Sequence, residues 1–501
     1  MNFEIEFFKF CQFLAEKQLK DVANYAANLS LIRYNSDLKV LDEAFENGEI
    51  SCDKYTYLKS KIEEYKNNSQ GVKIIGDKQV GYSDMDIFSC PSCFTQDEFM
   101  GAPPNLIKKS KGQEWDFSFI SYEKLFNDDN SLALGGEFLK KAMKKAFKDN
   151  PGGLRIDHII GIIDPWTYSK DDKLEAPENV VNGSRHIFKY LLNNELNELK
   201  QYGLNEQTIR GVIDPIKGVF DEKSPERQIL EKNGVFDFDK IKEIILSKRD
   251  ELDKIYSNVI ENIILAAARE VVSEKYVLQG RKIDKNQIFD EAIKLLICED
   301  LGALTIPVRE VMKKYNLKGM RDAGRANPYD KNYIFRESNP NEQENYWLIS
   351  THDTPSYKNI IKKYDSDWQN STFDYLEEEL GLPKLKRDSL FELLKAKVVR
   401  IFCADKNPKT KNNVILNWLD LFEAKRQYNT PGLYDKTKNW NLRICASDES
   451  FEKKYYEDII PNKKGINIPK VLCDSLKICT KGKKYDRLAE ELDKISCAME
   501  E

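Results

Sequence analysis

Three short carboxylate motifs, far apart in the chain, each follow a short apolar run. They are Arg155-Ile156-Asp157-His158, Cys298-Glu299-Asp300-Leu301-Gly302 and Thr351-His352-Asp353-Thr354. Short apolar runs of this kind are typical of buried β-strands, so the motifs are predicted to stand at strand ends. A fold that gathers several strand ends would bring together an aspartate, a glutamate and a second aspartate. Two of the three histidines in the chain lie in the same motifs.

The segments between the motifs alternate predicted strands with predicted helices. We expect strands at 72–77, 154–158, 295–299, 346–350 and 414–416, and helices at 3–27, 135–149, 373–404 and 483–498. This alternation indicates an α/β fold with parallel strands. Functional groups cluster at the carboxyl ends of the strands in a (β/α)₈ TIM barrel, which is the position predicted for the three carboxylates.

We therefore predict a TIM barrel with inserted helical subdomains. The barrel would occupy 1–445, with insertions at about 30–70 and 170–290, and a mostly helical extension would cover 446–501. The chain contains no internal repeat or low-complexity segment that would favour another architecture.

The charge balance excludes some classes of partner. The chain of 501 residues carries 78 basic and 83 acidic side chains, for a net charge of −5. Nucleic-acid and anionic-membrane partners favour a basic excess, so neither is expected. The sequence begins without a basic, signal-like stretch, and no apolar run reaches the roughly 18 residues that a membrane span needs. A cytoplasmic enzyme with a small polar or neutral substrate fits these features best.

The ten cysteines are scattered, and Cys90-Pro91-Ser92-Cys93 is the only CxxC. A zinc site usually needs a second pair or nearby histidines, and a redox CxxC usually opens a helix. We therefore predict structural or incidental thiols, which suit a reducing compartment. The carboxylate motifs also lack a local ligand pair such as HxH or HExxH, so no metal site is predicted.

The neighbours of the carboxylates suggest different chemical roles. Retaining chemistry at a sugar acetal needs an ionised nucleophile and a protonated acid. Arg155 lies two residues before Asp157, on the same face of a strand, and would keep that carboxylate charged and oriented. Glu299 has no basic neighbour in sequence and suits the acid/base role. Asp353, beside His352, could hold sugar hydroxyls in the transition state.

Each motif also has a purely structural interpretation. An Arg-x-Asp pair is often a core salt bridge, Glu-Asp-Leu-Gly is common at turns, and His-Asp-Thr-Pro is a plausible helix cap. Any one motif alone is more often structural than catalytic. Their joint occurrence, in this order and at strand ends, favours catalysis.

The same residues resemble the amylomaltase family, the 4-α-glucanotransferases or disproportionating enzymes. The three carboxylate motifs match the family's nucleophile, acid/base and transition-state motifs in order. Further matching blocks are Ile75-Gly76-Asp77, Met100-Gly101-Ala102-Pro103-Pro104-Asn105, Gly112-Gln113-Glu114-Trp115, Tyr428-Asn429-Thr430-Pro431-Gly432, and Asn439-Trp440 with Arg443. Together the blocks touch about half of the chain.

The resemblance implies a barrel enzyme that cleaves an α-1,4-glucan and holds a glucosyl group on Asp157. The enzyme would then pass that group to another glucan, a maltooligosaccharide or glucose, and would need no metal or organic cofactor. Glu299 would be the acid/base and Asp353 the transition-state stabiliser. The substrate-binding residues would be Arg155, His352, His158, Trp115 and Asn429.

The family usually begins with an additional strand and a Ser/Tyr-rich loop, which this sequence does not contain before its first predicted helix. A closed barrel needs every strand, so we expect an upstream segment, another segment or a separate polypeptide to supply it. Two alternatives follow: a hydrolytic α-glucanase with the same carboxylates, and a catalytically defective glucan-binding fragment.

Overall fold

The computed structural model describes most of the chain, in two compact units. The described residues are 2–68, 72–103, 112–170, 183–192, 196–202, 237–301, 304–325, 346–380, 384–403, 413–422, 427–430, 437, 439–443, 450, 453–479 and 485–500. The first unit comprises Met1–Gly112, Asp116–Cys298 and Thr305–Val311, and the second comprises Gln113–Trp115, Glu299–Leu304 and Met312–Glu501. Each unit is described by itself.

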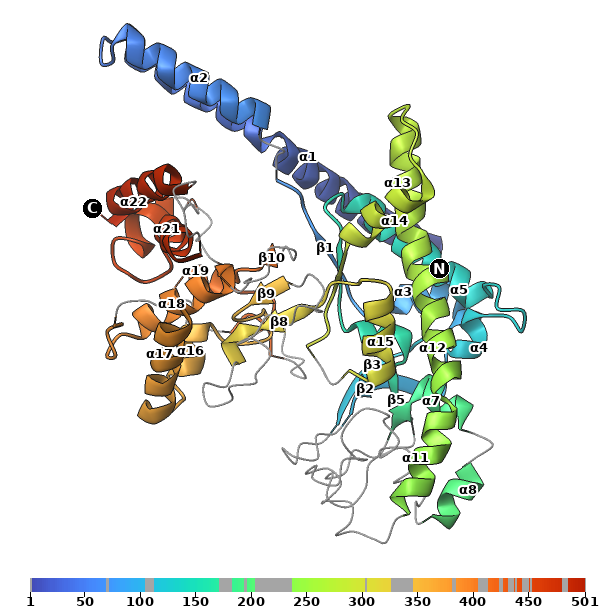
Figure 1. The fold of residues 1–501 in the computed structure, drawn as a ribbon. Helices are drawn as coiled ribbons and strands as arrows, with labels where there is room; N and C mark the ends of the chain where they lie inside the picture. Colours follow the sequence, from blue (N-terminus) through green and yellow to red (C-terminus); the bar gives the residue numbers. More distant parts are fainter. Residues whose placement is uncertain are drawn as a thin grey trace. The chain divides into compact units, whose positions relative to one another are not determined.

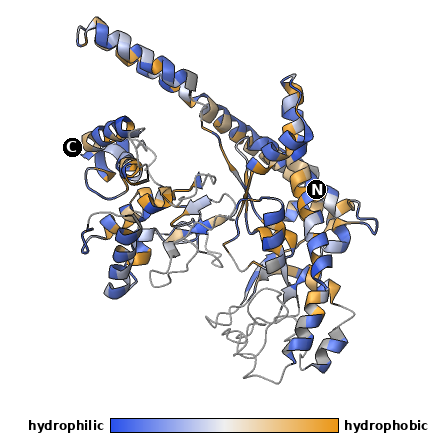
Figure 2. Cartoon of the chain, in the orientation of Figure 1, coloured by the Kyte–Doolittle hydropathy of each residue, from blue (hydrophilic) through white to orange (hydrophobic). Residues whose placement is uncertain are grey.

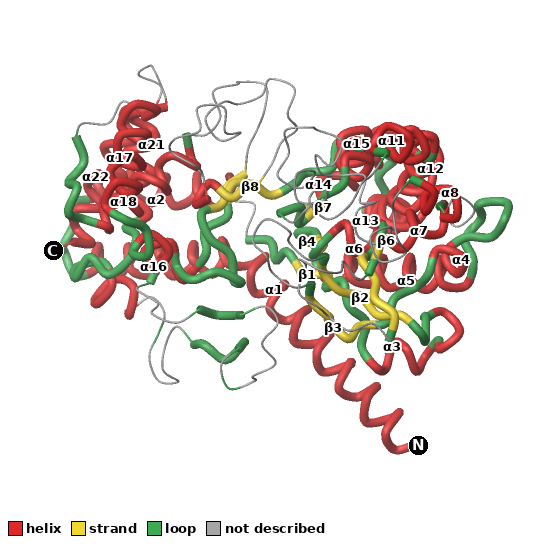
Figure 3. Tube along the Cα trace, turned by 90° about the horizontal axis from the view of Figure 1, so that it is seen from below, coloured by secondary structure: helices red, strands yellow, loops and turns green. Residues whose placement is uncertain are grey.

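A parallel sheet of three short strands forms the centre of the first unit (Figures 1 and 3). Its order is β1-β4-β7, with β1 at Gly76–Lys78, β4 at Leu154–Ile156 and β7 at Leu296–Cys298. Leu154 and Ile156 are buried on both sides of the partly exposed Arg155, and all three residues of β7 are buried. Buried, continuously apolar strands are typical of parallel sheets covered by helices.

A second sheet has the order β3-β2-β5-β6, and β5 pairs antiparallel with both β2 and β6. These strands are β2 Glu98–Ala102, β3 Gln113–Phe117, β5 Trp166–Ser169 and β6 Ser184–Arg185. Trp166 and Tyr168 of β5 are fully buried and form a small core with Phe99. Because β5 follows β4 through a single short helix, this sheet lies close in sequence to the carboxyl end of β4.

The helices of the first unit include a long hairpin and an amphipathic helix. α1 (Asn2–Glu46) packs against α2 (Cys52–Asn68), where Tyr55 donates a hydrogen bond to Asp42. Figure 2 shows apolar residues dispersed along this hairpin. α5 (Leu134–Asp149) buries Leu139, Met143 and Phe147, spaced four residues apart, as expected for one helix face. The remaining elements are α3 Asp84–Ser89, η1 Pro91–Cys93, α4 Tyr122–Leu125, α6 Ile159–Ile163, α7 His186–Leu191, α8 Leu196–Gln201, α11 Phe238–Ser247, α12 Arg249–Asn258, η2 Val259–Leu265, α13 Ala266–Leu278 and α14 Lys285–Lys294.

The second unit has its own parallel sheet and helical core. The strand order is β10-β9-β8, with β8 at Met320–Asp322, β9 at Tyr346–Leu348 and β10 at Asn413–Val414. α15 (Ile306–Lys314) precedes β8 in sequence and contains residues of both units. The other elements are η3 Ala323–Arg325, α16 Tyr357–Ile361, α17 Ser366–Leu380, α18 Leu390–Phe402, α19 Trp418–Leu421, η4 Lys454–Ile459, α21 Ile468–Cys479 and α22 Asp486–Glu500.

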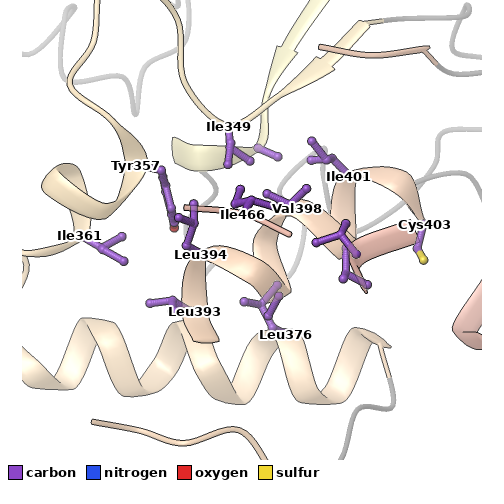
Figure 4. Close-up of a cluster of buried hydrophobic side chains, with 14 of the residues drawn as sticks. Ile349, Tyr357, Ile361, Leu376, Leu393, Leu394, Val398, Ile401, Cys403 and Ile466 are labelled. Atoms are coloured by element: carbon purple, nitrogen blue, oxygen red, sulfur yellow. The ribbon is translucent and has the colours of Figure 1, made fainter. Parts of the chain in front are cut away.

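The core of the second unit lies between β9 and the helices that follow it. Leu376, Leu393 and Val398 are fully buried there together with Ile349, the residue just after the end of β9 (Figure 4). Burial of each such side chain contributes about 1.5–3 kcal/mol of hydrophobic stabilisation. Because Ile349 lies two residues before Thr351, this core anchors the start of the Thr351-His352-Asp353 segment.

The α/β class predicted from the sequence is confirmed, and so are several of its elements. Strands occur at the predicted positions before Asp157, Glu299 and Thr351, and helices cover 134–149, 366–380, 390–402 and 486–500. The predicted strand at 72–77 begins later, at Gly76, because pairing with β4 starts there.

The cysteine prediction was wrong for the CxxC, since Cys90 and Cys93 form a disulfide. The 3₁₀ turn between them brings their Cα atoms to 5.5 Å, within the range that a disulfide spans. Among the described helices, none has the length and apolar character needed to cross a bilayer.

Candidate active site

Asp157 stands directly after β4, where a guanidinium contacts it. Its backbone N–H donates to the Lys78 carbonyl at 3.0 Å, so pairing with β1 continues one residue past the strand. The Arg155 Nη2 lies 2.7 Å from Asp157 Oδ1, which confirms the pairing predicted from the i, i+2 spacing. The Arg155 Nη1 contacts both carboxylate oxygens of Asp77 at 2.9 Å. The Asp157 side chain remains 33% exposed, so its carboxylate is held in place yet accessible.

The Asp77 contact follows from strand register. Asp77 of β1 lies directly opposite Arg155 of β4. Neighbouring strands are about 4.8 Å apart, so an aspartate on one can reach an arginine on the other. No role for Asp77 was predictable from the sequence, because the two paired residues are 78 positions apart.

His158 adopts a left-handed backbone conformation, with φ of 44°, immediately before α6. Burial lowers the pKa of His158 to about 4, and the nearby Arg185 charge adds to this effect, whereas Asp157 opposes it. The imidazole is therefore neutral near pH 7 and can take part in hydrogen bonding without carrying charge. A Cβ at Gly161 would come within 2.7 Å of the His158 ring, so the first turn of α6 requires a glycine there.

Glu299 follows β7 and is buried, with 9% of its surface exposed. Its Oε1 accepts a hydrogen bond from the Leu301 backbone N–H at 2.7 Å. The next residue, Asp300, has a structural position: it accepts from the Met320 N–H at 2.6 Å and from Arg321 Nη1 at 2.8 Å. These contacts tie the segment that carries Glu299 to β8.

Asp353, His352 and Asn429 are brought together in the second unit. The Asn429 side chain donates to Asp353 Oδ1 at 2.6 Å, and its backbone N–H donates to the His352 carbonyl at 3.0 Å. The His352 Nε2 lies 3.4 Å from the same Asp353 oxygen. Gln427 donates to the Asp353 carbonyl at 2.7 Å. Two predicted motifs, 76 residues apart, therefore form one polar cluster around the Asp353 carboxylate.

A buried hydrogen-bond network holds the backbone on both sides of this cluster. Asp420 accepts from the Ser350 hydroxyl at 2.5 Å and from the Tyr357 N–H at 2.6 Å. Asn417 donates to the Ser350 hydroxyl and to the Thr351 carbonyl. Burial raises the pKa of Asp420 to about 6, outweighing the two hydrogen bonds that lower it. The network holds both ends of the turn that presents His352 and Asp353.

Two tryptophans differ in their surroundings. Trp115, predicted to contact substrate, lies on β3, where its indole N–H donates to Gln113 Oε1 at 3.1 Å. Trp440 was quoted in a matching block without a role, yet its ring centroid lies 5.4 Å from that of His352. Neither Trp440 nor Asp420 was predicted from the sequence to have a role in the site. For Trp440, its position next to Asn439 in a matching block was a usable signal.

The first unit contains a cavity of about 580 Å³ whose lining includes none of the predicted site residues. It is lined by Pro91, Ser92, Phe94, Thr95, Gln96, Asp97, Glu98 and Lys124. Of these lining residues, Glu98 contacts His186 and Lys189, and His186 also contacts Glu123. The side chains described by the structure include no cluster of three or more His, Cys, Asp or Glu suited to a metal ion.

Asp157 and Arg155 belong to the first unit, and Glu299, His352, Asp353 and Asn429 to the second. Each group therefore places part of the predicted catalytic set at the carboxyl end of a parallel strand. In the first unit, Ile156 of β4 is paired in register with Cys298 of β7.

Comparison with known proteins identifies the family. Two amylomaltase structures resemble the chain, each at 15% identity and a TM-score of 0.45. The one from Streptococcus agalactiae in complex with acarbose is matched over 94% of this chain and 74% of that one. The one from Corynebacterium glutamicum is matched over 81% and 47%. No curated protein sequence matches the chain. A model of the 4-alpha-glucanotransferase family matches residues 57–447. The chain therefore belongs to the 4-alpha-glucanotransferase family, whose members are glycosyl-transferring enzymes.

Proposed function

We propose that the chain transfers an α-1,4-glucan segment to an acceptor glucan or glucose, with retention, through a covalent glucosyl-enzyme. The observation that carries this proposal is the Arg155–Asp157 ion pair at the carboxyl end of β4, beside the strand that leads into Glu299. Parallel neighbours have their carboxyl ends at one edge of a sheet. Retaining transfer requires a separation of about 5–5.5 Å between the two carboxyl groups.

Asp157 is the nucleophile in this proposal. Its carboxylate attacks the anomeric carbon, forming a C–O bond as the glycosidic C–O bond breaks. Glu299 gives its proton to the leaving 4-oxygen, and then removes a proton from the 4-hydroxyl of the acceptor that displaces Asp157. Arg155 contacts the Asp157 carboxylate and orients it for attack, and Glu299 is buried beside the end of β7.

The Asp353 cluster acts on the sugar that reacts. Asp353 accepts hydrogen bonds from sugar hydroxyls, and these bonds strengthen as the ring flattens toward an oxocarbenium ion. The Asn429 amide fixes the orientation of that carboxylate. His352, His158, Arg155 and Trp115 complete the substrate-binding residues of the proposal.

The fold proposed for the whole site is a (β/α)₈ barrel. The strand orders β1-β4-β7 and β10-β9-β8 are both parallel, and helices follow these strands along the chain. All three proposed catalytic carboxylates come after the carboxyl ends of strands, where barrel enzymes place their active sites.

Incubation with maltotriose tests the transfer function. We expect a ladder of shorter and longer maltooligosaccharides. Maltose and glucose alone would instead support a hydrolytic α-glucanase, the first alternative. Glucan binding without turnover, unchanged by Asp157→Asn, would support a glucan-binding fragment, the second alternative. In the transfer case, the same substitution abolishes the ladder.

A further inference from the structure

Trp440 is a large aromatic side chain that remains exposed beside the Asp353 cluster. It is 55% exposed. Its ring centroid lies 5.4 Å from that of His352, with the two planes tilted by 41°. His352 in turn contacts the Asp353 carboxylate. The indole is therefore one side chain removed from the Asp353 carboxylate.

The ring is held in place in spite of its exposure. Tyr428 meets it edge to face at 5.1 Å, and Trp418 supports Tyr428 in the same way at 5.6 Å. The Trp440 backbone N–H donates to the Tyr428 carbonyl at 3.1 Å. The preceding residue, Asn439, exchanges two hydrogen bonds with Thr430. An aromatic ring fixed before a ligand arrives loses little conformational entropy on binding.

The backbone at Trp440 is also unusual. Its φ is 59°, in the left-handed region that bulky residues rarely adopt. A residue in that conformation persists only where its surroundings determine it, and such residues concentrate at ligand-binding sites. Here the two Asn439 hydrogen bonds and the Tyr428 contact provide that constraint.

We propose that Trp440 is a stacking platform for a pyranose ring of the glucan, next to the sugar held by Asp353. The C–H groups on one face of a glucose ring form an apolar surface with a slight positive charge, which complements the negative face of an indole. The ring therefore determines how strongly glucan chains bind and takes no part in proton transfer. This inference rests on the proposed function, because it assumes that glucan occupies the Asp353 site.

Three substitutions separate stacking from simple packing. Trp440→Phe keeps an aromatic face, Trp440→Leu keeps apolar bulk without one, and Trp440→Ala removes both. Tyr456→Ala is the matched control, because Tyr456 is an aromatic residue of the same unit that is 51% exposed and lies outside the site. The full-length variants are compared by acarbose inhibition, by kcat and KM for maltotriose, and by thermal unfolding.

We expect Trp440→Ala and Trp440→Leu to weaken acarbose inhibition and raise KM by about tenfold, with a smaller change in kcat. Trp440→Phe should recover most of the affinity, and Tyr456→Ala should match the wild type. The stacking role would be refuted if Trp440→Leu bound acarbose like the wild type, or if Trp440→Phe bound it as weakly as Trp440→Ala. Wild-type protein that forms no maltotriose ladder and binds no acarbose would instead overturn the proposed function.

Discussion

The buried carboxyl of Asp420 gives a quantitative test of the network beneath the Asp353 cluster. The residue is only 3% exposed, and burial raises its pKa to about 6 from an ordinary value of 3.8. Because the folded pKa is the higher one, the folded protein binds the proton more tightly than the unfolded chain. This group therefore stabilises the fold at low pH, and that contribution is lost as pH rises through about 6.

The magnitude follows from the two pKa values. Each unit of pKa difference corresponds to about 1.4 kcal/mol, so the full contribution is about 3 kcal/mol. Between about pH 4.5 and about pH 7.5, the change amounts to about 2 kcal/mol, since protonation of the unfolded chain is already under way at the lower pH. Asp420→Asn cannot titrate and keeps an acceptor for the Tyr357 N–H, so it should lack this change.

Urea unfolding of the wild type and Asp420→Asn at both pH values measures the effect. Tryptophan fluorescence is a suitable signal, because Trp347, Trp368, Trp418 and Trp440 lie in the same unit as Asp420. We expect Asp420→Asn to be more destabilising at the lower pH than at the higher one, by about 2 kcal/mol. Titrating groups that do not interact with Asp420 affect both proteins equally and cancel. Equal pH dependence in the two proteins would refute the reasoning.

Three further predictions concern contacts around the site. Asp300→Ala should lower the free energy of unfolding by about 3 kcal/mol, because it leaves the half-buried Arg321 and the buried Met320 N–H without their acceptor. Chemical denaturation measures this, and a loss below about 1 kcal/mol would contradict it. Asn429→Ala should lower kcat for maltotriose about tenfold with a smaller change in KM. A rise in KM of about tenfold with an unchanged kcat would contradict this and show that Asn429 only binds substrate. The pKa of His186, raised to about 9 by Glu123 and Glu98 in spite of burial, predicts a stability contribution present below about pH 6.5 and lost toward pH 9. His186→Gln should remove that loss from a plot of Tm against pH, and parallel curves would count against it.

Local patterns predicted much of this structure from the sequence. The Arg155–Asp157 ion pair follows from strand periodicity, and the amphipathic helix at Leu134–Asp149 follows from its apolar spacing. The family resemblance implied that Asn429 binds substrate and that Asp353 stabilises the transition state, and their hydrogen bond depends on tertiary structure. The ion pair and the helix were predictable because the interacting residues are close in sequence.

The remaining site residues depend on pairings that a sequence does not display. Asp77 meets Arg155 only through the register of β1 and β4. Asp420 meets Ser350 across 70 residues, and an isolated aspartate near a predicted loop gives no sign that it is buried. Cys90 and Cys93 were predicted as thiols because the sequence offers neither further zinc ligands nor a helix after the pair, whereas the turn brings the two cysteines close enough for a disulfide. In each case, the decisive information lies in distances between segments.

The central claim is that Asp157 forms the covalent glucosyl-enzyme and that Glu299 acts as acid/base. Glu299→Gln incubated with α-maltotriosyl fluoride tests both roles, because a fluoride leaving group needs no acid whereas release to an acceptor needs the base. We predict that mass spectrometry of the digested protein will find a maltotriosyl group on the peptide that contains Asp157, and none when Asp157→Asn is added. A label on another carboxylate, or one that persists in the double variant, would contradict the account.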